Sequence, residues 1–376
     1  MDEGRITVLT LLDFSKAFDT ICHRLLCSKL AYCGFSDAAV ELIRSYLSNR
    51  HQRVILGSDL SSLCPVPSGV PQGSILGPLL FILYTADILK SIQHCNYQAY
   101  ADDTQLTLSF QPQERHIGEF LINSDLDRLY DLSQKHNLRL NPSKSLVTVF
   151  RGRKCKGIDS NLSIRIKNNE LSIQECVKSL GLQIDNRLKF SAQVNDNIRK
   201  AYCNLRLLYS NRDLLSPKLR TILCEALVLS HFNYCSYVYG PFLDVRDRER
   251  IQRVQNTCCR LIFGLRKYDH VSLRIRELKW LNMNERRDFL FGVFVHKIMC
   301  TGAPSYLREK LVVRNAIHNV NTRHNGVLDV PRHTTAIRRK CVTCQATLSY
   351  NKIPLELKEL QPDNFKYNFK KYLLNK

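Results

Sequence analysis

The sequence predicts an α+β protein in which an antiparallel sheet with packed helices comes first and a purely helical region follows. Two observations indicate this order. Strand-like runs alternate with segments of helical spacing up to about residue 188, and only helical spacing is found from about residue 190. The charge shifts as well, because residues 1–150 carry a net charge of −2 and residues 151–376 carry +23. Both changes predict a domain boundary near residues 185–190.

The first part opens with a nearly continuous apolar run, residues 5–12, which stops at Asp13 as a central strand of a covered sheet would. Helical spacing predicts helices at 19–33, 36–48, 79–92 and 113–137. Short strands fit at 52–56, 145–150, 162–166, 171–173 and 177–184. Residues 64–78 hold four prolines and three glycines and therefore begin as an extended loop.

Residues 97–110 predict a β-hairpin. Apolar and polar side chains alternate from Gln105 to Phe110, which is the period of a half-buried strand, and residues 97–101 are also strand-like. Asp102 and Asp103 fall between the two runs. Because aspartate tolerates the backbone angles of a tight turn, we expect this pair at the hairpin tip.

The second part is helical and strongly basic. Its predicted helices span 191–210, 217–231, 246–264, 284–300 and 362–374. The surplus of 23 positive charges over residues 151–376 indicates that a polyanion, most simply a nucleic acid, is held mainly by the C-terminal portion, although surface charge also serves solubility. The basic residues expected to contact a phosphate backbone are Arg199, Lys200, Arg206, Arg212, Lys218 and Arg220. Tyr234, Tyr237 and Tyr239 could stack on bases, but their apolar surroundings favour a core position.

The cysteines and the apolar stretches favour an intracellular, soluble protein, in the nucleus or the cytoplasm and not secreted. Six of the fifteen cysteines lie in apolar, helix-like segments, where a free thiol acts as a small hydrophobe: Cys22, Cys27, Cys224, Cys235, Cys258 and Cys259. No secretory signal is visible, and the longest apolar stretch, residues 75–89, is too short and too interrupted to span a bilayer. No membrane partner is expected.

Three aspartates stand where burial is expected, namely Asp13, Asp102 and Asp103. Clustered carboxylates repel one another and are costly to desolvate without cations. Two Mg²⁺ ions would balance them and could activate a hydroxyl and stabilise a leaving pyrophosphate. The alternative is that Asp13 caps the following helix and that Asp-Asp is simply a good turn. The residues alone leave both readings open.

The surrounding motifs are more specific. Residues 12–19 read LDFSKAFD, residues 68–78 read SGVPQGSILGP, and residues 100–103 read YADD. Residues 140–144 (LNPSK) and Leu180-Gly181 follow. In this order and spacing they resemble five motifs of the reverse transcriptases of non-LTR retrotransposons, which are LINE-type elements, nearest the jockey and CR1-like groups. Residues 256–266 and the C-terminal segment are similar to downstream parts of the same elements, although Tyr350 stands where the family usually has Trp.

The resemblance implies a polymerase palm at 1–188, a basic helical thumb at 189–300 and a basic C-terminal region at 301–376. It implies an RNA-directed DNA polymerase that transfers nucleotides onto a primer 3′-hydroxyl. Asp13, Asp102 and Asp103 would then hold two Mg²⁺ ions, with Mn²⁺ as a substitute. Lys144 would protonate or neutralise pyrophosphate, unless it is only an exposed turn lysine.

The same resemblance implies the substrate-binding residues. Phe18 would lie beneath the incoming sugar and exclude a 2′-hydroxyl, although a core aromatic at a helix start is the alternative. Gln72 and Gly73 would lie against the nascent base pair, and Gly181 would belong to a hairpin that grips the primer end. The implied partners are an RNA template, a DNA primer or duplex, and deoxynucleoside triphosphates.

Two further expectations follow. Polymerases of this type place a fingers subdomain before the first aspartate, but only twelve residues precede Asp13, so we expect an upstream segment or another chain to supply the fingers. Without them, a catalytically inactive fragment that only binds nucleic acid is the alternative function; a different palm enzyme, such as a nucleotide cyclase, fits the motif order less well. His324, His333, Cys341 and Cys344 give only weak evidence for zinc, because Cys341 and Cys344 alone have ligand spacing.

Overall fold

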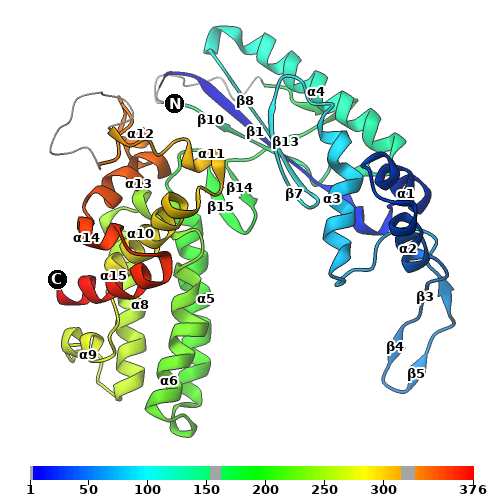
Figure 1. The fold of residues 1–376 in the computed structure, drawn as a ribbon. Helices are drawn as coiled ribbons and strands as arrows, with labels where there is room; N and C mark the ends of the chain where they lie inside the picture. Colours follow the sequence, from blue (N-terminus) through cyan, green and yellow to red (C-terminus); the bar gives the residue numbers. More distant parts are fainter. Residues whose placement is uncertain (1–2, 153–161, 315–326) are drawn as a thin grey trace. The chain divides into compact units, whose positions relative to one another are not determined.

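The computed structural model describes residues 3–152, 162–314 and 327–376, and the chain divides into two compact units, residues 3–180 and 181–376 (Figure 1). The first unit combines a sheet with helices, and the second is mainly helical. The protein therefore has a mixed α+β fold, with strands and helices together in the first unit, as the sequence predicts. None of the helices in the described residues is both long and apolar enough to cross a bilayer.

A five-stranded sheet forms the centre of the first unit, in the order β13-β10-β1-β8-β7. The strands are β1 (Ile6–Leu12), β7 (Asn96–Tyr100), β8 (Asp103–Phe110), β10 (Leu146–Phe150) and β13 (Ser172–Ile173). All neighbours are antiparallel except β10 and β13. The apolar run at residues 5–12 is confirmed as the central strand, and it is central because it pairs along both edges.

Four helices pack with this sheet: α1 (His23–Tyr32), α2 (Asp37–Leu47), α3 (Leu76–Leu89) and α4 (Arg115–Lys135). They share one apolar core with the strands, in which Leu26, Leu30, Leu126 and Leu129 are fully buried. The helical spacing at 36–48 and 113–137 is confirmed to within a few residues, whereas the first helix starts later than predicted because a 3₁₀ turn (Ala17–Asp19) precedes it.

The short strands differ most from prediction. Residues 52–56 belong to a thin exposed ribbon of two-residue strands: β3 (His51–Gln52), β4 (Ile55–Leu56), β5 (Asp59–Leu60) and β6 (Cys64–Pro65). Residues 177–184 are two strands, β14 (Cys176–Ser179) and β15 (Leu182–Asp185), because Leu180 and Gly181 take left-handed backbone angles between them. The remaining short strands are β2 (Phe14–Ser15), β9 (Arg139–Leu140), β11 (Arg165–Ile166) and β12 (Asn169–Glu170).

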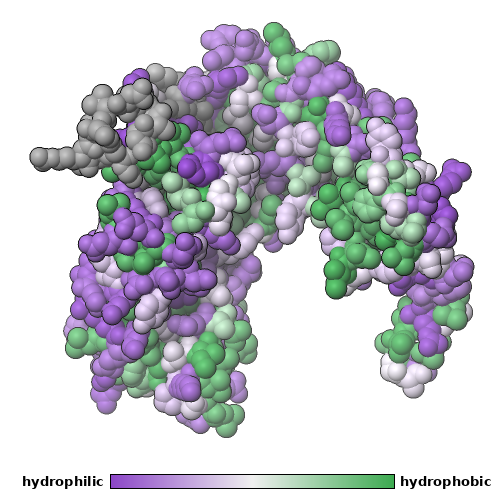
Figure 2. Space-filling model, viewed as in Figure 1, coloured by the Kyte–Doolittle hydropathy of each residue, from purple (hydrophilic) through white to green (hydrophobic). Residues whose placement is uncertain are grey.

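Apolar side chains outside the core gather on α3 and on the exposed ribbon (Figure 2). Ile75, just before α3, is 95% exposed, and Leu79 and Ile82 on α3 are about half exposed. Ile55 and Leu56 in the ribbon are also mostly exposed. Exposed apolar patches of this kind are typical of surfaces that further protein covers.

In the described part of the second unit, a helix lies within or close to each of the five predicted ranges: α5 (Ser191–Ser210), α6 (Pro217–Leu223), α8 (Val245–Phe263), α10 (Met283–Thr301) and α15 (Pro362–Asn375). The predicted helix at 217–231 changes type after α6, into a π-helical turn and then a 3₁₀ turn. Further helices lie between these: α7 (Ser236–Tyr239), α9 (Ser272–Glu277), α11 (Ser305–Arg308), α12 (Ala336–Lys340), α13 (Val342–Asn351) and α14 (Leu355–Lys358).

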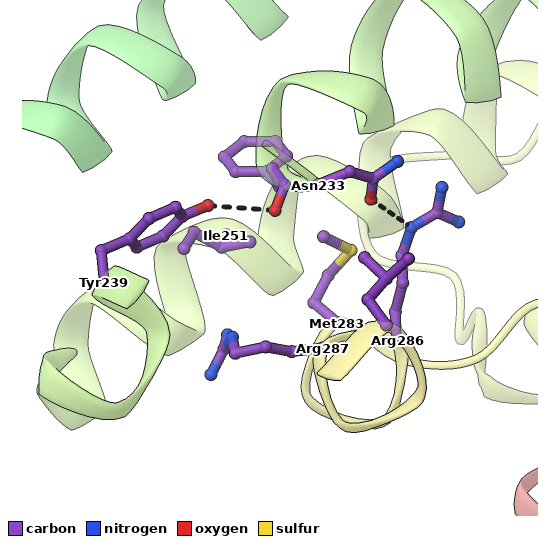
Figure 3. A pocket seen from close by; sticks show the side chains of 8 residues that line it. Asn233, Tyr239, Ile251, Met283, Arg286 and Arg287 are labelled. Carbon is purple, nitrogen blue, oxygen red and sulfur yellow. Dashed lines mark hydrogen bonds between the residues drawn. The ribbon is translucent and has the colours of Figure 1, made fainter. Parts of the chain in front are cut away.

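Two of the three tyrosines considered for base stacking have structural roles. Tyr239 is buried and its hydroxyl donates to the carbonyl of Phe232 at 3.0 Å (Figure 3). Tyr237 stacks on Phe294 with ring centroids 4.5 Å apart. The preference for a core position is confirmed for these two and is wrong for Tyr234, which is 54% exposed.

A buried carboxylate fixes the chain where it enters β7. Asp125 on α4 is fully buried and accepts hydrogen bonds from the backbone N–H groups of Gln93, His94 and Cys95 at 3.1, 2.8 and 2.8 Å. Arg128 also donates to it, at 2.8 Å. Burial alone would raise the pKa of Asp125, but the backbone hydrogen bonds outweigh burial and lower this pKa.

We expect Asp125→Asn to lower the free energy of unfolding by roughly 2–4 kcal/mol, because an amide cannot accept all of these bonds. The stability that Asp125 contributes is present above the ordinary carboxyl pKa, near 3.8, and is lost as the pH falls through the lower folded value. Urea unfolding at pH 7 and near pH 3 measures both effects. The control Asp131→Asn removes only an exposed ion pair with Lys167 and should cost under about 1 kcal/mol; equal losses in the two variants would contradict the prediction.

Candidate active site

The pairing of β1 with β8 brings the three predicted aspartates to one end of the sheet. Leu12 is paired with Thr104, so Asp13 directly follows the last β1 pair and Asp103 lies at the adjacent position on β8. Tyr100 pairs with Asp103 across the hairpin, which leaves Ala101 and Asp102 as its two-residue loop. The predicted hairpin is therefore present, with Asp102 in its loop and Asp103 at the first position of β8.

These carboxylates interact electrostatically. Partial burial and the negative charges of Asp102 and Asp13 raise the pKa of Asp103. Within the described residues, none of the three side chains forms an ion pair. Among the described residues, no group of three or more His, Cys, Asp or Glu side chains is placed so that it could hold a metal ion. The three carboxylates nevertheless suit a hard divalent cation, because such a cation prefers carboxylate oxygens as ligands. A bound cation would also offset the repulsion between their negative charges.

The backbone of Asp13 is held by the segment at 141–145. Its N–H donates to the hydroxyl of buried Ser145 at 3.2 Å, and its carbonyl accepts from the N–H of Asn141 at 2.8 Å. Phe14 on β2 pairs with Leu140 on β9. The turn that carries Lys144 therefore lies beside Asp13, and Lys144 is exposed on it without an ion pair in the described residues. No sequence signal distinguished Ser145.

The Pro- and Gly-rich loop is docked onto the turn that follows Asp13. Gly69 N–H donates to Ile21 O and Val70 N–H donates to Phe18 O, both at 2.8 Å. A Cβ on Gly69 would lie 2.7 Å from Asp19 Cα, so only glycine permits this approach. His23 Nε2 donates to the carbonyl of Gly69 at 2.7 Å. The roles of Gly69 and His23 were missed by sequence reasoning, because both depend on contacts distant in sequence.

The predicted substrate-binding residues occupy different settings. Phe18 is half-buried and stacks on Phe81, with centroids 4.6 Å apart, so it does contribute to the core. The exposed Gln72 donates from Nε2 to Asp19 Oδ1 at 2.8 Å. Gly73 has a φ of +79°, and a Cβ there would meet nothing within 4 Å, so its requirement for glycine is conformational. Gly181 lies in the second unit, where it faces the ring of Tyr234.

Comparison with known proteins supports the motifs. Residues 1–184 match the family described as reverse transcriptase (RNA-dependent DNA polymerase). The chain is 28% identical to the probable RNA-directed DNA polymerase from transposon X-element of Drosophila melanogaster, over 71% of this chain and 29% of that protein. It is 26% identical to the RNA-directed DNA polymerase from mobile element jockey of the same organism, over 89% of this chain and 36% of that protein. Residues 1–184 therefore belong to the reverse transcriptase family, and the relatives of the chain are polymerases of non-LTR elements.

The chain spans about a third of the length of the curated relatives that it matches. Among solved structures, the chain is similar to telomerase from Candida tropicalis in complex with a fragment of telomeric RNA. The match has 12% identity and spans 73% of this chain and 49% of the telomerase chain. Its TM-score of 0.34 is too low to support any structural argument.

The basic residues of the second unit that are predicted to contact phosphates are not equivalent. Arg220 donates to the carbonyls of Leu215, Arg212 and Leu261 at 2.9, 2.7 and 3.2 Å. Its guanidinium therefore binds carbonyl groups of the protein at helix ends. The prediction that Arg220 contacts a phosphate backbone is corrected accordingly. Arg206 and Lys218 are exposed and have no ion pair within the described residues.

Three more of the predicted cations are partly neutralised. Arg199 and Lys200 both pair with Asp196, at 2.8 and 2.7 Å, so that one carboxylate faces two positive charges on the surface of α5. Arg212 lies 3.5 Å from Asp213. These exposed pairs are weak and leave a net positive helix surface.

Of the four zinc candidates, only the thiols of Cys341 and Cys344 lie together in the described residues. Cys341 and Cys344 are hydrogen-bonded neighbours, and the pKa of Cys344 is raised to about 11 by burial and by the adjacent thiol. His333 is exposed and contacts the carbonyl of Pro331 at 3.2 Å. His324 lies outside the described residues. In the parts that are described, no third His, Cys, Asp or Glu joins the two thiols.

Proposed function

We propose that the chain supplies the palm and thumb of an RNA-directed DNA polymerase that extends a primer 3′-hydroxyl along an RNA template, using deoxynucleoside triphosphates. One observation carries this proposal: the β1–β8 register places Asp13 beside the hairpin of Asp102 and Asp103, and no cation of the described residues neutralises them. The palm corresponds to residues 1–188, the thumb to 189–300 and a basic C-terminal region to 301–376.

Asp13, Asp102 and Asp103 would hold two Mg²⁺ ions, or Mn²⁺ in their place. When bound, such ions lower the pKa of a hydroxyl nucleophile and stabilise a leaving oxygen. Groups of the chain itself would position one ligand and supply a further positive charge. The bonds from Ser145 and Asn141 to the Asp13 backbone keep that carboxylate at the sheet end, and Lys144 on the adjacent turn supplies a mobile positive charge for pyrophosphate.

The exposed apolar residues of α3 and the ribbon support the expectation that further protein packs on the first unit. We propose that it includes the fingers, which would add the cations that hold the triphosphate. Gly181 is proposed to belong to the primer-gripping hairpin, and Gln72 and Gly73 to line the nascent base pair.

Primer extension on an RNA template tests this function. The chain should extend a labelled DNA primer when Mg²⁺ or Mn²⁺ is present and should stop when EDTA is added. The alternative, a fragment that only binds nucleic acid, is favoured by the net charge of +23 on residues 151–376. Duplex binding that weakens steeply with salt, without extension in either metal or with an added fingers segment, would establish that alternative.

Phe18 provides a test of substrate choice. We expect Phe18→Val to raise the use of ribonucleotides relative to deoxynucleotides by about 10- to 100-fold, because the smaller side chain leaves room for the 2′-hydroxyl. Single-nucleotide incorporation with dGTP and GTP measures the ratio. The control Phe81→Leu also removes the ring stacking but keeps the Phe18 side chain, so it should lower stability without changing the ratio. An unchanged ratio in Phe18→Val would assign Phe18 to the core alone.

A further inference from the structure

A concave surface lies in the first unit, beside the turn that follows Asp13. It is a cleft of about 740 Å³ that reaches from this turn to the end of α4. Its lining includes Lys16, His23, Arg24, Gln134 and Arg139. None of the three proposed metal ligands lines it, and neither do Phe18, Gln72 and Gly73, so it is separate from the proposed reaction centre.

The charge of this cleft is entirely positive. Lys16 precedes the 3₁₀ turn, Arg24 lies in the first turn of α1, and Arg139 lies in β9, so three separate segments each supply one cation. No Asp or Glu lines the cleft. Within the described residues, none of these three cations forms an ion pair. Unpaired cations that converge on a concave surface raise the local concentration of anions.

The walls of the cleft are held in place by backbone contacts. Ser15 pairs with Arg139 between β2 and β9, which fixes the backbone at Arg139 beside the residue that precedes Lys16. Lys16 has a left-handed φ of +50°, and this backbone conformation is uncommon for lysine. His23 donates to Gly69 and so ties α1 to the opposite loop. The cations therefore stand on a preformed surface.

The lining also indicates how a ligand is recognised. Hydroxyl and amide groups, such as those of Ser68, Gln134 and Asn137, accompany the cations. No Phe, Tyr or Trp lines the cleft, so it offers no platform on which a base could stack. Cations, hydroxyls and amides together are the groups that contact phosphates and sugars without reading sequence.

We propose that this cleft binds the sugar–phosphate backbone of a nucleic-acid strand through Lys16, Arg24 and Arg139. The inference rests on the proposed function, which supplies the nucleic acid, and adds a place on the first unit where one strand is held. The first unit, with its net charge near zero, would then bind nucleic acid through a local cluster of cations, whereas the second unit would rely on its overall charge.

Strand binding by the full chain tests this inference. The chain carries Asp102→Asn throughout, so that no extension occurs, and fluorescence anisotropy follows a labelled 20-nucleotide single-stranded RNA. Lys16→Gly, Arg24→Gln and Arg139→Gln are combined; glycine at position 16 also suits the left-handed backbone. We expect the affinity to fall about 100-fold at 0.1 M salt, and the slope of log Kd against log salt to fall by about 2, because each phosphate contact contributes roughly 0.7.

The matched control removes three exposed cations of the same unit that lie outside the cleft, through Lys90→Gln, Arg165→Gln and Lys178→Gln. It should change the affinity by less than about threefold. An equal loss in the control would show a net-charge effect, and an unchanged affinity in the cleft variant would show no contact; either result overturns the proposal. Circular dichroism confirms that both variants fold. Because binding is measured without extension, a chain that binds through the cleft but never extends a primer would disprove only the proposed function.

Discussion

Asp102→Asn should abolish primer extension, with a loss of at least about 10³-fold, while leaving the fold intact. Asparagine keeps the shape of the side chain but removes the charge that a divalent cation needs, and a 10³-fold loss corresponds to about 4 kcal/mol of transition-state stabilisation. Asp102 makes no ion pair within the described residues, so little native structure depends on it. Removing its charge also removes one of the causes that raise the pKa of Asp103. We therefore expect the variant to be as stable as the wild type or slightly more so.

Single-turnover extension and thermal unfolding, measured on the same preparations, separate the two effects. Asp59→Asn is the matched control, because Asp59 also lies in a hairpin and is exposed, but is remote in sequence from the three aspartates. It should extend like the wild type. If Asp102→Asn still extended a primer at the wild-type rate, the proposed reaction centre would be wrong, and the juxtaposition of the three aspartates would be only a consequence of turn chemistry.

The arrangement of these aspartates was predictable because it follows from local rules. The apolar run before Asp13 and the alternation after Asp103 each identify a strand, and the preference of Asp for tight turns identifies the connection. Once β1 and β8 pair in the observed register, the carboxylates must share one end of the sheet. Long periodic helices such as α4 and α5 were predictable for the same reason.

Other features depend on distant contacts and were not predictable. Ser145 lies 132 positions from Asp13, and nothing near it in the sequence indicates that its hydroxyl binds that backbone. Arg220 looked like any other basic residue of an exposed helix, yet it bonds the end of α8. Helices of four or five residues, such as α7 and α12, are too short to show a period, and their formation depends on tertiary packing.

Apart from the aspartate variants, Gly69→Ala is the substitution that we expect to lower the free energy of unfolding most. The new Cβ would lie 2.7 Å from Asp19 Cα and 2.8 Å from Phe18 O, and both are backbone atoms. The loop cannot move away cheaply, because Gly69 and Val70 donate hydrogen bonds across the same contact. The φ of +88° at this position adds a conformational cost of about 1–2 kcal/mol. With overpacking of about 1–3 kcal/mol, we expect a total near 3–4 kcal/mol.

Gly73→Ala in the same loop separates steric from conformational effects. Gly73 also has a positive φ, of +79°, but its Cβ would face open space, so only the conformational part of the cost applies. Urea unfolding should therefore show a loss two to three times larger for Gly69→Ala. Where Gly69→Ala still folds, a loop lifted from Phe18 should raise the KM for deoxynucleotides at least tenfold, since Phe18 and Gln72 would no longer be held together. Equal destabilisation by the two alanines would show that the loop does not need its close contact with Asp19, and that backbone conformation alone explains the glycine at position 69.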